Sequence, residues 1–250
     1  FAKQGVQADY LNPSYPSITF PNHYSIITGL YPSSHGLIDN FFYDYKRQEA
    51  YKMNDAKVVS DGSWYGGKPL WSLAEEQGLL SASLFWVASQ SDAGKTRPTY
   101  YYNYHEKFSA DQKINIVIDW LKLPEEKRPH FISLYFPEVD SAGHHFGTDS
   151  PETQKAVTFV DDSIAKLVSK TKELGLKNVN FIFVSDHGMI NVDRDNAMDI
   201  PEVLKDKQRF DFYNSQSLLR VKVKDFNDLK STYKSLKGSA NGRYKVYTSD

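Results

Sequence analysis

The spacing of apolar positions predicts two long helices. Ser109 begins a capping box with Gln112, a common way for a helix to start. The apolar residues that follow share one face at helical spacing, namely Ile114, Val117, Ile118 and Leu121. Ser150 and Pro151 begin the second helix, which Gly175 should end. Its apolar face would comprise Ala156, Val160, Ile164, Leu167 and Val168. A shorter helix is expected from about Leu70 to Gly78.

Short apolar segments of strand length lie between these helices. They are Ser81–Trp86, Phe131–Phe136 and Val179–Ser185, and each leads into polar or glycine-rich sequence. Alternating strands and helices indicate an α/β fold, with a mostly parallel central sheet sandwiched by helices. In such sheets ligands bind outside the carboxyl ends of the strands. We therefore expect the chemistry just after Phe136 and just after Ser185.

The last fifty residues differ from this alternation. They predict a strand–helix–strand excursion over Leu218–Val223, Asp225–Leu236 and Tyr244–Tyr247, without a cluster of reactive side chains. We interpret residues 1–199 as the core of a catalytic domain. Residues 200–250 would be a structural arm or subdomain edge of the same domain, which would continue beyond residue 250.

Composition excludes several classes of binding partner and chemistry. The charges nearly balance, with 30 basic and 31 acidic residues, so a long-range field for capturing duplex nucleic acid is absent. The chain contains no cysteine, which excludes thiol catalysis and cysteine-based zinc sites. No apolar run is long enough to predict a membrane span, and no signal peptide is visible. The first residue is phenylalanine, so we expect the native N-terminus to lie upstream.

Two polar clusters follow predicted strands. Asp140 and His144 come after the strand ending at Phe136, and Asp186 and His187 end the most apolar strand. Carboxylate and imidazole are the natural ligands for zinc where thiols are absent. Each cluster alone has a structural interpretation, Asp140 as a helix cap or His187 as a core histidine. Two clusters at the ends of two strands favour a shared metal site.

Thr19 supplies a possible nucleophile. It stands just before a short helix that Pro21 can open and Gly29 can close. A threonine there is commonly a simple N-cap. The same position also places its hydroxyl where the helix N-terminus favours a phosphate oxyanion, and a metal ion would remove its proton.

These segments resemble those of one known family. The stretch from Pro16 to Asn40 is similar to the nucleophile segment of the nucleotide pyrophosphatase/phosphodiesterases, which belong to the alkaline phosphatase superfamily. Four further matching segments follow in the family's order: Lys68–Trp71, Phe85–Trp86, Asp140–His144 and Ser185–Gly188. The resemblance covers at least residues 5–189 and implies an alkaline phosphatase-like fold.

The resemblance also implies roles for individual residues. Thr19 resembles the covalent nucleophile, and Asn40 the residue that binds a phosphoryl oxygen together with the Thr19 N–H. Thr19, Asp186 and His187 would bind one of two Zn²⁺ ions. Asp140 and His144 would bind the other. Without the resemblance, Asn40 would be interpreted as a turn residue. Three remaining histidines match no ligand position, and we expect structural roles for them: His23, His35 and His145.

Two aromatic residues resemble a pair that sandwiches a nucleotide base, Phe20 and Tyr135. Either could equally be an ordinary cleft or core residue. Some nucleotide-directed members carry lysines beside the nucleophile and the asparagine, where this chain has Ile18 and Phe41. Lipid-derived or other phosphodiesters therefore stay open as substrates.

The resemblance implies zinc-dependent hydrolysis of phosphodiester or pyrophosphate bonds through a phosphothreonine at Thr19, giving nucleoside 5′-monophosphates from nucleotides. It also implies a periplasmic or extracellular location. The family's upstream aspartate and downstream histidine ligands have no counterpart here, so we expect a fragment that lacks its first strand. The alternatives are a phosphomonoesterase or phosphonate hydrolase on the same fold, and an inactive module that binds phosphate ligands.

Overall fold

The computed structural model describes residue 3, residues 5–215 and residues 217–248. These form two compact units, residues 1–191 and 192–250, whose outermost residues lie outside the described ranges. The α-helices and strands of the first unit are α1 Thr19–Thr28, α2 Pro32–His35, β1 Phe41–Asp44, β2 Glu49–Lys52, α3 Ala56–Val59, α4 Leu70–Glu76, β3 Ser81–Leu84, β4 Tyr100–Tyr102, α5 Ala110–Leu121, β5 Phe131–Leu134, α6 Glu138–Phe146 and α7 Pro151–Glu173. Short 3₁₀ turns join several of them.

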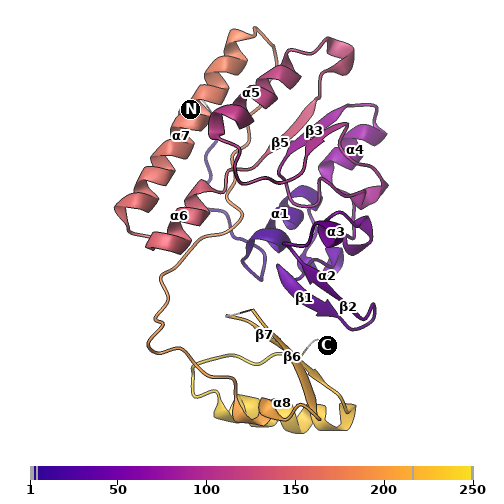
Figure 1. Cartoon of the computed structure of the whole chain (residues 1–250), viewed down its shortest axis with the longest axis vertical. Helices are drawn as coiled ribbons and strands as arrows, with labels where there is room; N and C mark the ends of the chain where they lie inside the picture. The colour runs from indigo at the N-terminus through magenta and orange to yellow at the C-terminus, as the bar shows by residue number, and fades with distance from the viewer. Residues whose placement is uncertain (1–2, 4, 216, 249–250) are drawn as a thin grey trace. The chain divides into compact units, whose positions relative to one another are not determined.

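A parallel sheet in the order β4-β3-β5 organises the first unit (Figure 1). Side chains of alternate strand residues point to opposite faces. Leu84 and Ile132 face a core cluster built with α5 and α7, whereas Phe131 packs against a second cluster that contains Tyr24 of α1 and Trp71 of α4. Helices therefore cover both faces of this sheet, as the alternating pattern predicts.

The predicted long helices are confirmed. Ser109 and Gln112 form the capping box of α5, and Ser150 caps α7 by accepting from the Thr153 N–H. Gly175 follows α7 in the left-handed conformation that glycine adopts at low cost. Local sequence determines these boundaries.

The strand predicted at Val179–Ser185 is wrong. The segment is irregular and belongs to none of the described sheets. Ile182 is 85% exposed. An apolar run becomes a strand only where another strand supplies hydrogen-bonding partners, so composition alone does not suffice here.

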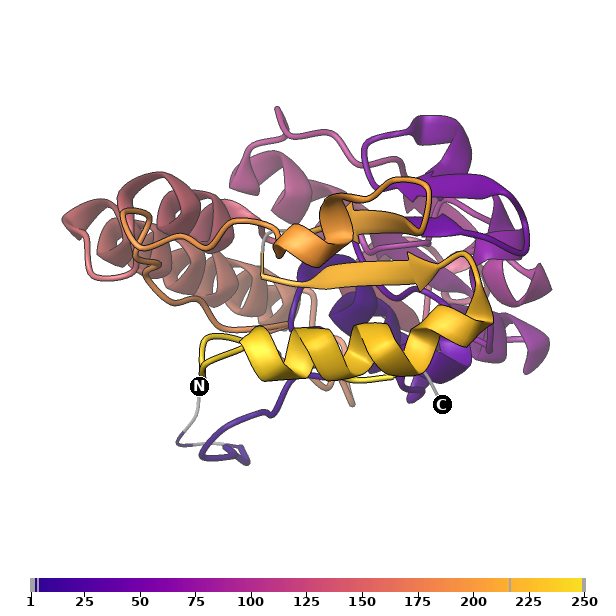
Figure 2. The ribbon, with the colours of Figure 1, turned by 90° about the horizontal axis from the view of Figure 1, so that it is seen from below.

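The second unit contains β6 Phe210–Asn214, β7 Leu219–Val223 and α8 Leu229–Ser239. β6 and β7 pair antiparallel, and Figure 2 shows α8 running along this hairpin. Leu204, Phe210 and Leu236 form its buried core. The β7 strand and the helix are confirmed, but the strand predicted at Tyr244–Tyr247 is wrong, because that segment has no ladder partner among the described residues. The pattern also missed β6.

Candidate active site

Helix α1 positions Thr19 at its first turn. Ile18, in extended conformation, is the N-cap, and Gly29 ends the helix by donating to the Ser25 carbonyl. The interpretation of Thr19 as the N-cap is therefore wrong, as is the expectation that Pro21 opens the helix. Thr19 is the first helical residue, and Pro21 is tolerated two residues later because first-turn N–H groups have no partner within the helix.

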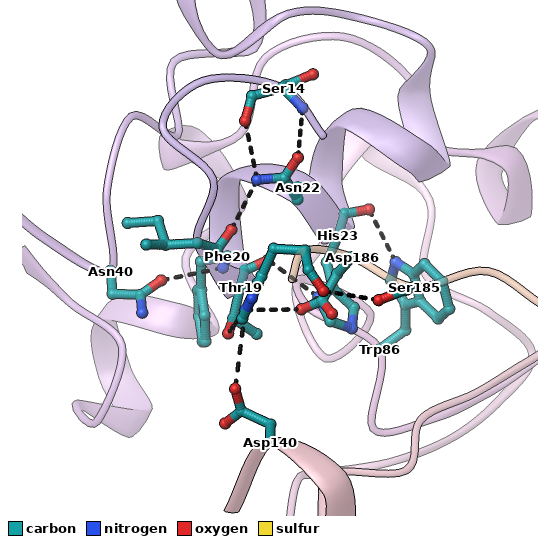
Figure 3. Close-up of polar contacts among 12 residues, drawn as sticks. Ser14, Thr19, Phe20, Asn22, His23, Asn40, Trp86, Asp140, Ser185 and Asp186 are labelled. Carbon is teal, nitrogen blue, oxygen red and sulfur yellow. Dashed lines mark hydrogen bonds and ion pairs between the residues drawn. The ribbon is translucent and has the colours of Figure 1, made fainter. Parts of the chain in front are cut away.

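A buried amide holds the chain that leads into α1. Asn22 is 2% exposed, and its Oδ1 accepts a 2.7 Å hydrogen bond from the Ser14 N–H (Figure 3). Its Nδ2 donates to the carbonyl oxygens of Ser14, Pro16 and Ile18 at 2.9 to 3.1 Å. One side chain thus satisfies several backbone groups beside Thr19.

Asn40 lies next to the start of α1. Its Oδ1 accepts a 3.0 Å hydrogen bond from the Phe20 N–H, which leaves its Nδ2 hydrogens for another partner (Figure 3). Within the described ranges, no group accepts from the Thr19 N–H. The amide of Asn40 and the N–H of Thr19 could therefore bind an anion together.

Asp186 and His187 come close to Thr19, although the segment before them is not a strand. His187 Nε2 lies 3.1 Å from Thr19 Oγ1 and 3.4 Å from Asp186 Oδ2. Burial tends to raise the pKa of Asp186. The contacts with His23 and the nearby His187 outweigh it and lower the pKa. The Asp186 carboxylate is therefore ionised at neutral pH.

Asp140 and His144 come from α6, which follows β5. Asp140 Oδ1 lies 3.9 Å from His187 Nε2 and 3.5 Å from His144 Nε2. This oxygen is buried and has no hydrogen-bond partner among the described residues. His144 is the most exposed of these residues, at 67% of its side chain.

Two contacts hold α6 in place. The buried ammonium of Lys113 donates a 2.7 Å hydrogen bond to Glu138 at the start of α6. The end of the Met189 side chain packs against Gly143 of α6, in the space that a Cβ at this position would need. The pattern did not single out Lys113 or Glu138, since nothing in the sequence shows that α5 and α6 meet.

The candidate base-binding rings both lie near the nucleophile helix. Phe20 packs edge-on against Tyr51, with centroids 6.2 Å apart, and joins one core cluster. Tyr135 contacts the His23 ring at 4.8 Å. Burial, and next the charges of Asp186 and Asp140, raise the pKa of Tyr135. Tyr135 thus shares the electrostatic environment of the carboxylates.

The oxygen and nitrogen atoms gathered around Thr19 can be compared with those that a metal ion requires. Within the described ranges, no three histidine, aspartate or glutamate side chains converge closely enough to hold a metal ion. Yet the hydroxyl, two carboxylates and two imidazoles form a continuous series of near neighbours, and Asp140 Oδ1 is a buried anionic oxygen to which no described group donates. Oxygen and nitrogen donors of this kind fit zinc.

His23, for which the sequence predicts a structural role, also lies beside the candidate site. It lies one helical turn after Thr19, with its ring 3.2 Å from Asp186. The i,i+4 spacing from Thr19 was the available signal, because such residues share a helix face.

A parallel sheet covered by helices, with a hydroxyl at a helix start and carboxylates and imidazoles beside it, fits the class of hydrolases that act on phosphate esters. The sequence model of the type I phosphodiesterase/nucleotide pyrophosphatase family matches residues 1–250, and the chain belongs to this family.

Individual relatives agree. The chain is 43% identical over 188 residues to human ectonucleotide pyrophosphatase/phosphodiesterase family member 1, and 38% identical over 192 residues to venom phosphodiesterase 2 of Crotalus adamanteus. These matches cover 75% and 76% of this chain but only 20% and 24% of the relatives. The chain therefore spans about a quarter of their length or less.

A solved structure of murine ectonucleotide pyrophosphatase/phosphodiesterase 5 matches with a TM-score of 0.83 and 24% identity. The match covers 93% of this chain and 61% of that one. The expected alkaline phosphatase-like fold is thereby confirmed. None of the helices among the described residues is both long and apolar enough to span a membrane.

Proposed function

We propose that the protein hydrolyses phosphodiester or pyrophosphate bonds with Thr19 as its nucleophile. One observation carries the proposal: Thr19 Oγ1 lies 3.1 Å from His187 Nε2, at a helix start where the Thr19 N–H has no acceptor among the described residues. A hydroxyl among metal-type donors and anion-binding N–H groups suits attack on phosphorus.

The proposed cofactors are two Zn²⁺ ions. Thr19, Asp186 and His187 would hold one, and Asp140 and His144 the other. Bound zinc supplies positive charge that favours the alkoxide and hydroxide forms of the nucleophiles and stabilises phosphoryl oxygens. Asp140 Oδ1, a buried oxygen that accepts no hydrogen bond within the described ranges, supports this donor set.

The reaction proceeds in two steps. Thr19 Oγ1 loses its proton to solvent and attacks phosphorus. A new phosphorus–oxygen bond forms, and the leaving alcohol or phosphate departs with the electrons of the broken bond and takes up a proton from solvent. Asn40 and the Thr19 N–H bind a non-bridging oxygen. Water then loses a proton to solvent and attacks the phosphothreonine from the opposite side. The bond between phosphorus and Thr19 Oγ1 breaks, the phosphorylated product leaves, and Oγ1 takes up a proton. Two in-line attacks retain the configuration at phosphorus.

Nucleotides are the proposed substrates, with nucleoside 5′-monophosphates as products. Phe20 and Tyr135 would bind the base, since both rings lie on or against α1. A second solved structure of the murine member 5, an inactive threonine-to-alanine variant, is a complex with AMP. The names of the relatives, with their ecto- and venom enzymes, support a periplasmic or extracellular location.

The test replaces the nucleophile in the zinc-loaded protein. Thr19→Ala should lower hydrolysis of the p-nitrophenyl ester of thymidine 5′-monophosphate by roughly a thousandfold or more, while zinc content is kept. Thr19→Ser should retain part of the rate. Thr28→Ala, on the same helix, is the matched control. Near-normal turnover by Thr19→Ala would refute the assignment.

A monoester, p-nitrophenyl phosphate, separates the remaining alternatives. Faster turnover of the monoester would indicate a phosphomonoesterase. Binding of AMP without turnover of any ester would indicate a binding module.

A further inference from the structure

His23 is a buried histidine that faces both halves of the candidate site. It is 3% exposed. Its Nδ1 lies 2.9 Å from the carbonyl oxygen of Thr19 and 3.2 Å from Asp186 Oδ2 (Figure 3). One ring nitrogen thus contacts both the backbone of the nucleophile and a carboxylate more than 160 residues further along the chain.

The two groups that contact Nδ1 determine which ring nitrogen of His23 carries the hydrogen. A carbonyl oxygen and an ionised carboxylate can only accept hydrogen bonds. Nδ1 therefore bears the hydrogen and donates toward both. The neutral ring can satisfy both contacts only as the Nδ1–H tautomer.

Aromatic neighbours fix the ring in this orientation. Trp86 contacts it edge-on with centroids 4.9 Å apart, and Tyr135 does so at 4.8 Å. The indole Nε1 of Trp86 also donates a 3.1 Å hydrogen bond to the His23 carbonyl. Both the ring and its backbone are held, so the donor has little freedom to turn away from Asp186.

We propose that His23 is a positioning residue that orients the Asp186 carboxylate relative to Thr19 and so sets the affinity for metal. This rests on the proposed function, since Asp186 and Thr19 are its proposed ligands. Hydrogen bonds to ligating carboxylates orient them, and losing such a bond commonly costs about 10- to 100-fold in metal affinity.

A purely structural role makes a different prediction. If His23 serves only to fill space, the ring matters and its Nδ1 donor does not. His23→Phe keeps an aromatic ring against Trp86 and Tyr135 but removes the donor. His23→Asn removes the ring but places an amide N–H near the position of Nδ1. The two variants therefore separate donor from ring.

The first measurement uses Zn²⁺ added to the metal-free chain, with affinity determined by competition with a chelator. His23→Phe should lose about 10- to 100-fold in affinity, and His23→Asn should recover most of it. His130→Phe, at an exposed position, is the control. Equal affinities for His23→Phe and the unsubstituted chain would overturn the proposal, as would a loss in His23→Asn as large as that in His23→Phe.

The second measurement needs no metal. ¹⁵N NMR of the metal-free chain should show His23 as the Nδ1–H tautomer, and an Nε2–H tautomer would overturn the proposal. Failure of the unsubstituted chain to bind Zn²⁺ would refute the proposed metal site and the affinity role with it. That outcome differs from binding that is insensitive to His23→Phe, which refutes the role of His23 alone.

Discussion

The segment that carries Thr19 is held by buried polar side chains, whereas the apolar segment that leads to Asp186 and His187 is mostly exposed. Residues 14–40 contain buried polar groups, such as Asn22 and His35, that bond to nearby backbone or side chains. Residues 179–185 are mostly apolar, but most of them lie exposed, and the segment belongs to none of the described sheets. Short-range hydrogen bonds can shape a loop and helix, but a strand depends on partners distant in sequence.

Among the substitutions that test this contrast, Asn22→Ala should lower the free energy of unfolding most. It removes every hydrogen bond made by a buried amide and leaves backbone groups of Ser14 unpaired, so we expect a loss of about 3 kcal/mol in the free energy of unfolding. All four tryptophans lie in the first unit, so their fluorescence during urea unfolding reports that unit. Asn54→Ala, at an exposed position, is the control. A loss below about 1 kcal/mol, that of one ordinary hydrogen bond, would show that the Asn22 network does not hold the loop.

His35 should make this region sensitive to acid. Its Nδ1 accepts from the Leu37 N–H, its Nε2 contacts Ser25 Oγ, and burial lowers its pKa from 6.5 to about 4. Below pH 6.5 the unfolded chain binds a proton that the folded chain does not, so stability falls as the pH falls. Through His35 alone, the free energy of unfolding should fall by about 2 kcal/mol between pH 7.5 and pH 5.

Unfolding of His35→Asn at both pH values tests this. The variant should lack that part of the pH dependence, and the exposed control His130→Asn should retain it. If His35→Asn and the unsubstituted chain lose the same stability on acidification, His35 is not the group responsible.

Ile182→Ala should have the smallest effect. The side chain is 85% exposed, so truncation should change the free energy of unfolding by less than about 0.5 kcal/mol. Leu84→Ala, on the buried strand β3, should cost about 2 to 5 kcal/mol in the same assay. A large loss in Ile182→Ala would mean that residues 179–185 are buried after all, and would erase the contrast with residues 14–40.

The sequence predicts those parts of the fold that local signals determine. Caps and apolar faces located α5 and α7, and the alternation of strands and helices led to the parallel β3–β5 pair. Val179–Ser185 and Tyr244–Tyr247 carry strand-like residues, but pairing is not a local property. The β6–β7 hairpin was missed in part for the same reason.

The candidate site was predicted from two polar clusters expected after strands, but only Asp140 and His144 follow a strand, β5, in the structure. Asp140 and His187 follow different segments, yet they lie within 3.9 Å of each other and His187 reaches Thr19. The i,i+4 spacing places His23 on the helix face of Thr19, but its contact with Asp186 was not predictable, because Asp186 is far away in sequence. Only the folded arrangement shows which acceptors face its ring.

The absence of a side chain at Gly143 has an evolutionary consequence. Met189 occupies the space that a Cβ at position 143 would need, so the two donor-bearing segments touch at this point. The atoms in that space are the end of a flexible side chain, so Met189 can turn aside for a small side chain at position 143 at little cost. We therefore expect homologues to tolerate alanine or serine at position 143 with methionine kept at position 189. Only a large residue at position 143 should select for a change at position 189.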